Sequence, residues 1–232
     1  MTAKEMIRRF GTQIHQGNLR NPFDTDDILY FLNRAQLKFV KDHFDQSPYS
    51  PFTYQDRQSI FDDIRTMFVK DEKIETTYGG AASQFKDKHV DTIEFPENYM
   101  FFVSARAEVE YSWKGIEWVV VNGKREVTNL NTNRLIANVK VARPNEIYKS
   151  LSDPFNNGIY SRPIADINDT NLNVFSDNTY VTDYVILDYI RKPSKIEYDG
   201  TIDNASMLPD STHEEIIELA VQIASQSSNS QE

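Results

Sequence analysis

Residues 184–190, Tyr-Val-Ile-Leu-Asp-Tyr-Ile, are almost continuously apolar. A run of this length and composition is typical of a strand that is covered on both faces. Pro193 follows closely and ends the strand, because proline cannot donate a hydrogen bond to a sheet. Residues 172–175 precede this strand on the other side of Asp177-Asn178, so the two stretches predict a hairpin.

The residues before this hairpin extend the β-rich region back to about residue 93. Asn122-Gly123 is the strongest short hairpin signal in the sequence, and it separates two of the predicted strands. The predicted strands of this part of the chain occupy residues 101–113, 116–121, 125–130 and 135–141.

Amphipathic helices are predicted at both ends of the chain, at residues 2–16, 24–45, 53–70 and 212–224. In the second helix Asp24 is the candidate N-cap. Its apolar residues then recur at spacings of four, three and four, which places them on one face: Ile28, Leu32, Ala35 and Phe39. A short proline-containing connection to the third helix favours an antiparallel pair.

These patterns predict an α+β fold, with an antiparallel helical bundle built from both termini and an inserted antiparallel β-rich domain. The bundle is expected to comprise residues 1–70 and 205–226, and the β-rich domain residues 93–204. Residues 71–92 are polar and contain Gly79-Gly80, so an exposed loop or arm is expected there. Residues 227–232 are expected to form a flexible tail.

The composition excludes several classes of protein. The chain has 232 residues, of which 39% are hydrophobic and 26% charged, as in a globular protein. It has no cysteine, which excludes disulfides, thiolate metal sites and cysteine nucleophiles. The net charge of -10 has the wrong sign for a protein that grips nucleic acid through its whole surface. The first residues lack the pattern of a signal peptide, and no long apolar run predicts a membrane span.

The sequence contains none of the standard catalytic motifs. The chain contains no phosphate-binding glycine loop, no Gly-x-Ser-x-Gly and no His-Glu-x-x-His. We therefore expect no enzyme activity, no cofactor and no metal. An Asn-rich stretch at 166–183 holds four aspartates without the spacing of a calcium-binding loop, so a calcium site there is left open: Asp166, Asp169, Asp177 and Asp183.

Two segments resemble a known family. Residues 26–40 contain Asp-Ile-x-x-x-Leu-Asn-x-Ala-Gln-x-x-Phe-Val, which resembles the opening helix of phage head-to-tail adaptor proteins, also called tail tubular protein A. Near the C-terminus, Tyr-x-x-Lys-Pro at 189–193, Leu-Pro at 208–209 and His-Glu-x-Ile-Ile at 213–217 are similar to the tail of the same group. Residues 152–156 look like ring proteins of crAss-like and related short-tailed phages.

The resemblance implies a structural virion protein that performs no chemistry. It implies a homo-oligomer, a dodecameric ring, that joins the portal protein to neighbouring tail ring proteins while DNA passes through its lumen without specific binding. It also implies a place in the tail or neck of the virion and assembly in the cytoplasm of the host bacterium. The family-motif residues, which are candidates for interfaces, are Ile28, Leu32, Asn33, Ala35, Gln36, Phe39, Lys192, Pro193, Pro209, Glu214 and Ile217.

Other functions stay open at this point. Within the virion, the chain could be another ring or a tail-completion protein. From a different class, a carbohydrate- or ligand-binding module would use exposed aromatic side chains as a binding platform. The candidates for such a platform are Tyr111, Trp113 and Trp118, which the pattern places on or beside strands.

Overall fold

The computed structural model describes residues 1–16, 23–45, 62–82, 87–129, 131–143, 146–153 and 158–229. The chain divides into two compact units. Unit 1 combines residues 1–68 with residues 191–232, and unit 2 is the continuous stretch 69–190. The chain therefore passes between the units twice, at residues 68–69 and at residues 190–191.

Unit 1 contains three long helices, α1 (Ala3–Gln16), α2 (Thr25–Asp45) and α5 (His213–Asn229), within its described residues. The caps predicted from the sequence form: the Glu5 amide donates to Thr2 Oγ1, and the Asp27 amide donates to Asp24 Oδ1. α5 packs against both α1 and α2. A short hairpin of β12 (Glu197–Tyr198) and β13 (Asp203–Asn204) contacts α1.

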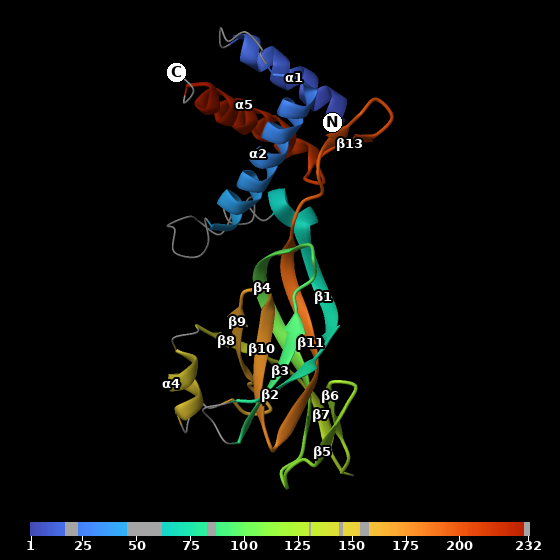
Figure 1. The fold of residues 1–232 in the computed structure, drawn as a ribbon, viewed down its shortest axis with the longest axis vertical. Coiled ribbons are helices and arrows are strands. Elements are labelled where there is room, and N and C mark those ends of the chain that lie inside the picture. The colour runs from blue at the N-terminus through green and yellow to red at the C-terminus, as the bar shows by residue number, and fades with distance from the viewer. Residues whose placement is uncertain are drawn as a thin grey trace. The chain divides into compact units, whose positions relative to one another are not determined.

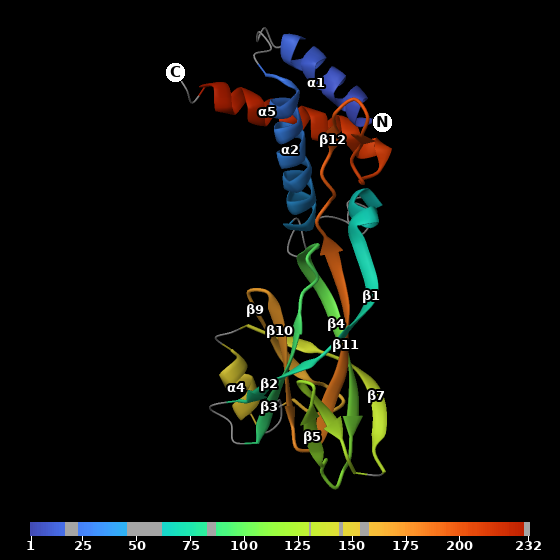
Figure 2. The ribbon, with the colours of Figure 1, turned by 45° about the vertical axis from the view of Figure 1, so that its right-hand side comes forward.

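Within the described residues, nine strands of the stretch 68–191 form one sheet, which folds into a β-sandwich of two layers joined where Asp177 pairs with Tyr180. Figures 1 and 2 show these strands from two directions. One layer follows the order β8-β9-β10-β3-β2, and the other follows β7-β4-β11-β1. The strands of the first layer are β8 (Lys140–Ala142), β9 (Ile164–Asn168), β10 (Asn171–Asp177), β3 (Lys88–Glu94) and β2 (Thr77–Ala81). Those of the second are β7 (Asn133–Asn138), β4 (Tyr99–Tyr111), β11 (Tyr180–Arg191) and β1 (Phe68–Glu75).

The core of unit 2 lies between these layers. Leu172 and Val174 of β10 meet Val185 and Leu187 of β11 in one buried cluster. Only Val139 separates β7 from β8, so the chain changes layer there. The short helix α4 (Ile147–Ser152) packs against β9. Asn122 and Gly123 both have positive φ in the turn between β5 (Trp118–Val121) and β6 (Lys124–Val127), which confirms the predicted hairpin.

The predicted fold class is wrong. Strands hold more of the described residues than helices do, and the molecule is not an antiparallel helical bundle built from both termini. In both ribbon views α2 crosses α5 instead of running alongside it. The helix predicted at 53–70 falls partly outside the described residues. In the part of this stretch that the structure describes, residues 62–64 are helical and Arg65–Met67 form a 3₁₀ turn. β1 begins directly after this turn.

The expectation of an exposed loop at 71–92 is also wrong. This stretch contains most of β1, all of β2 and the beginning of β3. The polar residues of β1 lie on a strand that pairs only with β11 among the described residues, and charged side chains are usual on such edges. Gly79-Gly80 lies inside β2, where the pairing with β3 shifts by one residue between Tyr78 and Gly80.

Candidate functional site

Most of the family-motif residues of α2 face the interior of unit 1. They are fully or almost fully buried, with exposed fractions of 5% or less: Ile28, Leu32, Ala35, Gln36 and Phe39. Ile217 of α5 is equally buried. These side chains therefore pack inside unit 1.

Asn33 and Gln36 bond to the backbone that directly follows the Tyr-x-x-Lys-Pro motif at 189–193. The Asn33 side chain accepts from the Ile196 amide at 2.8 Å and donates to the Ile196 carbonyl at 3.0 Å. The side-chain amide of Gln36 donates through Nε2 to the Ser194 carbonyl at 2.8 Å. Two polar side chains of α2 thus satisfy the backbone that follows Lys192 and Pro193, of which Lys192 is exposed and Pro193 buried.

The remaining motif residues lie at the start of α5. Pro209 is half-buried and precedes a 3₁₀ turn at Asp210–Thr212 that leads into α5. Glu214 is half-exposed and forms an ion pair with Arg9 of α1. The structure therefore gives both residues contacts within unit 1.

An exposed aromatic cluster stands at the end of β4. Tyr111 stacks on Tyr160 with ring centroids 4.1 Å apart, and Trp113 meets Tyr160 edge-on at 5.1 Å. Trp113 is 77% exposed, although its side chain is large and apolar. Trp118, the third aromatic residue predicted for a platform, lies in a different cluster with Tyr78. The sequence does not predict the part of Tyr160 in this cluster, because Tyr160 lies 47 residues away from Trp113 and its neighbours form no pattern.

A buried charge network fixes the β5–β6 hairpin to the sandwich. Arg125 of β6 donates through Nε to Asp91 Oδ1 of β3 at 3.0 Å, and its Nη2 donates to Asp91 and to Ser176 of β10. Both side chains of the ion pair are at most 2% exposed. The guanidinium also lies against the rings of Tyr78 and Trp118, at 5.5 and 5.2 Å. The sequence does not predict this pair, because Arg125 and Asp91 are 34 positions apart and no local pattern joins them.

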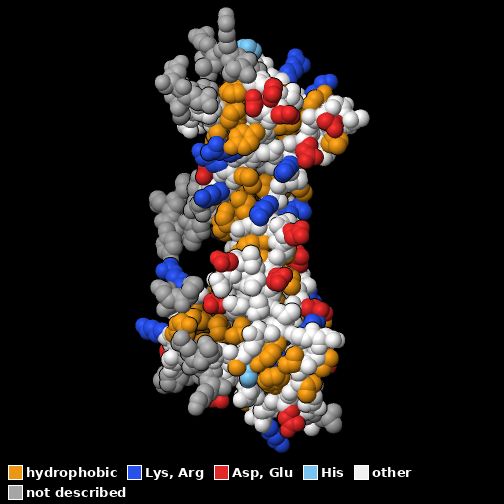
Figure 3. Space-filling model, in the orientation of Figure 1, with side chains coloured by type: hydrophobic (Ala, Val, Ile, Leu, Met, Phe, Trp, Pro, Cys, Tyr) orange, Lys and Arg blue, Asp and Glu red, His pale blue; other side chains and the backbone are white. Residues whose placement is uncertain are grey.

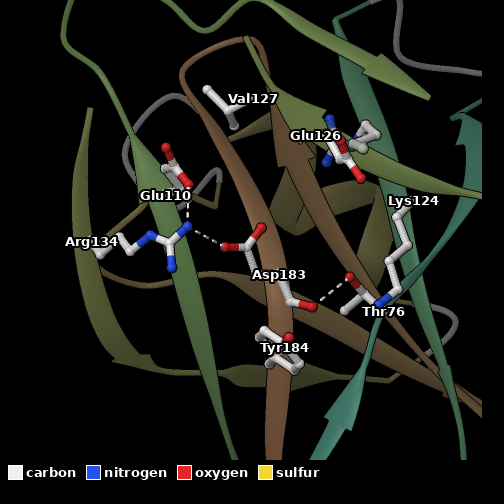
Figure 4. A pocket seen from close by; sticks show the side chains of 9 residues that line it. Thr76, Glu110, Lys124, Glu126, Val127, Arg134, Asp183 and Tyr184 are labelled. Carbon is white, nitrogen blue, oxygen red and sulfur yellow. Dashed lines mark hydrogen bonds and ion pairs between the residues drawn. The ribbon is translucent and has the colours of Figure 1, made fainter. Parts of the chain in front are cut away.

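A polar pocket of about 380 Å³ opens beside this network. Arg134 lies between two carboxylates: its Nη2 donates to Glu110 at 3.0 Å and is 3.6 Å from Asp183, as Figure 4 shows. Burial raises the pKa of Asp183 to about 6. The positive charge of Arg134 lowers this pKa, and the negative charge of Glu110 raises it. The hydrogen bond to Glu110 raises the pKa of Arg134 above its usual value.

Two consecutive residues of β11, Asp183 and Tyr184, line this pocket, as Figure 4 shows.

The aspartates of the stretch 166–183 do not converge. Asp166 lies on β9 and Asp169 in the turn after it, whereas Asp177 pairs with Lys88 at 3.2 Å and Asp183 approaches Arg134. Among the residues that the structure describes, no group of three or more His, Asp and Glu side chains is placed to hold a metal ion.

Apolar side chains are exposed on two strands of unit 2. On β5 they are Val119, Val120 and Val121, each between 37% and 49% exposed, and on β7 they are Leu135 and Ile136. Figure 3 shows apolar side chains gathered over the β5–β6 hairpin. β7 pairs with β4 in a regular register, and within the described residues its other edge has no partner strand. Free edges of this kind can accept a strand from another chain.

Within the described part of the chain, none of the helices has the length and apolar character that crossing a membrane requires. Comparison with known proteins gives no further assignment: no protein-family model matches the sequence, and no curated protein matches it.

Proposed function

We propose that the chain is a structural subunit of a phage head-to-tail connector, in which copies form an adaptor ring that joins the portal to the tail. The observation that supports the proposal is a contact beside the motifs that resemble the adaptor family. Asn33 and Gln36 of the first motif bond to the backbone at 194–196, which directly follows the Tyr-x-x-Lys-Pro motif at 189–193.

The exposed apolar side chains of unit 2 also support a role in assembly. Contiguous apolar surface on a protein is typical of interaction sites. A contact of β5 on one copy with β7 on the next would be heterologous, which is the kind of contact that a closed ring requires.

The test is the oligomeric state of the full-length protein, alone and mixed with purified portal rings and tails from the phage that encodes it. We expect electron microscopy to show a ring of this protein bound to the portal. Assembly on the tail alone would favour another ring or a tail-completion protein. A chain that stays monomeric and binds neither portal nor tail would overturn the proposal.

A second candidate function rests on the aromatic cluster of Tyr111, Trp113 and Tyr160. A tryptophan that is 77% exposed beside two stacked tyrosines resembles a platform for the apolar face of a sugar. A glycan array separates this candidate from the first. Binding that is lost in Trp113→Ala and kept in Trp118→Ala would support a carbohydrate-binding module.

A further inference from the structure

α2 presents a basic face to solvent. Successive residues of a helix are about 100° apart, so the side chains opposite its buried stripe can be identified from their positions. They include three exposed cations, Arg34, Lys38 and Lys41. Tyr30 and Leu37 lie among them and are 60% and 44% exposed. Figure 3 shows Lys and Arg side chains over α2.

The three cations of this basic face have no acidic partner among the residues that the structure describes. Other exposed cations, such as Lys114, Lys149 and Arg162, also have no ion pair within the described residues. The three cations of α2 differ from these because they lie together within two turns of one helix, in a chain with a net charge of -10. An acidic partner fits such a surface.

α5 presents a shorter acidic face to solvent, formed by Glu215 and Glu218. Glu215, Glu218 and Gln222 are exposed and lie opposite the buried residues of this helix, such as Ile216 and Ala220. Neither Glu215 nor Glu218 forms an ion pair within the described part of the chain. Glu215 and Glu218 are three residues apart, so the charged part of this face extends over about 5 Å, whereas Arg34 and Lys41 are about 10 Å apart along α2.

The two faces cannot neutralise each other within one molecule. α2 and α5 pack together in unit 1, and each face lies opposite the buried side of its helix. The faces therefore point away from each other. A second copy of the chain could bring its acidic face to the basic face of the first and leave its own basic face free for a third.

We propose that the basic face of α2 binds the acidic face of α5 on the neighbouring copy. This inference rests on the proposed ring, and it names the surfaces that would build it. The contact is heterologous, so repetition closes a ring or extends a filament. Opposite charges set the register and the association rate, whereas Tyr30 and Leu37 contribute apolar contact. DNA would fit the basic face alone and would leave the acidic face of α5 without a role.

Charge reversal on the full-length protein tests the contact. One variant carries Arg34→Glu, Lys38→Glu and Lys41→Glu, a second carries Glu215→Lys and Glu218→Lys, and a third combines all five changes. The control reverses three exposed cations of unit 2, Lys114→Glu, Lys149→Glu and Arg162→Glu. Mass photometry and electron microscopy measure assembly, alone and on portal rings, at low and high salt.

We expect each of the first two variants to weaken self-association by about tenfold or more, since like charges then meet. The combined variant is expected to restore assembly, and the control to assemble as the wild type does. Circular dichroism checks that every variant is folded. Restoration by the combined variant cannot result from misfolding, so it identifies the contact itself.

Two results would overturn the inference without touching the proposed function. In the first, the wild-type chain forms rings, and both reversal variants form them equally well or the combined variant restores nothing. In the second, reversal on α2 leaves rings intact and abolishes a gel shift with double-stranded DNA, which assigns the basic face to nucleic acid. A wild-type chain that never assembles and binds neither portal nor tail removes the proposed function itself.

Discussion

Asp183 is the residue whose chemistry depends most on the fold. Its side chain is one-fifth exposed and has only Arg134 as a charged partner of opposite sign within 4 Å among the described residues. Burial raises its pKa from 3.8 to about 6, so the folded state binds a proton more readily than the unfolded chain does. The raised pKa therefore contributes to the free energy of unfolding. This contribution is fully present below pH 3.8 and is lost as the pH rises through 6.

We expect Asp183→Asn to be more stable than the wild type at pH 7.5, where the native carboxylate is charged. One pKa unit corresponds to about 1.4 kcal/mol, and contact with water reduces the effect, so roughly 1–2 kcal/mol is expected. Urea unfolding at pH 7.5 and pH 4.5 measures it, with the exposed Glu97→Gln as control. An advantage of the same size at both pH values would contradict the assignment.

At the scale of elements, the sequence predicts those helices and turns that depend on interactions between residues close together in the chain. α1, α2 and the β5–β6 turn follow from capping residues, an apolar stripe and Asn122-Gly123. β1 and β2 were missed because edge strands carry charges and glycines, which resemble a loop in the sequence. In the candidate site, Trp113 was identified from its type. The pairing of Arg125 with Asp91 was not, because only the folded sheet brings distant strands together.

This pairing gives a prediction for the β5–β6 hairpin. Arg125→Met removes the cation and leaves Asp91 buried with hydrogen bonds from Ser176 and the Thr182 amide but no positive charge. The expected loss is about 3–5 kcal/mol of unfolding free energy, measured by urea denaturation. Hydrogen exchange should show the largest loss of protection in residues 118–127, because Arg125 anchors this hairpin.

A double variant provides the control. Adding Asp91→Asn to Arg125→Met removes the uncompensated charge, so part of the lost stability should return. If Arg125→Met alone stays within about 0.5 kcal/mol of the wild type, the buried pair is not what fixes the hairpin.

At the scale of the whole molecule, the two units differ in how the chain builds them. Unit 1 needs both ends of the chain, since α5 packs on α1 and α2. Unit 2 is one continuous stretch, and its first and last strands, β1 and β11, are paired neighbours. Its buried clusters are built entirely from its own residues. It therefore has the properties of a domain that folds alone.

We expect the fragment 69–190 to fold without the rest of the chain. It should give a cooperative urea transition and a dispersed amide spectrum, because its core and its sheet pairings are complete. The fragment 69–180 is the matched control: it lacks nearly all of β11, and with it Val185, Leu187 and Tyr189 of the main cluster, so it should remain unfolded. A non-cooperative transition for 69–190 would mean that unit 1 contributes to the stability of the sandwich, and the two units would then be one folding unit.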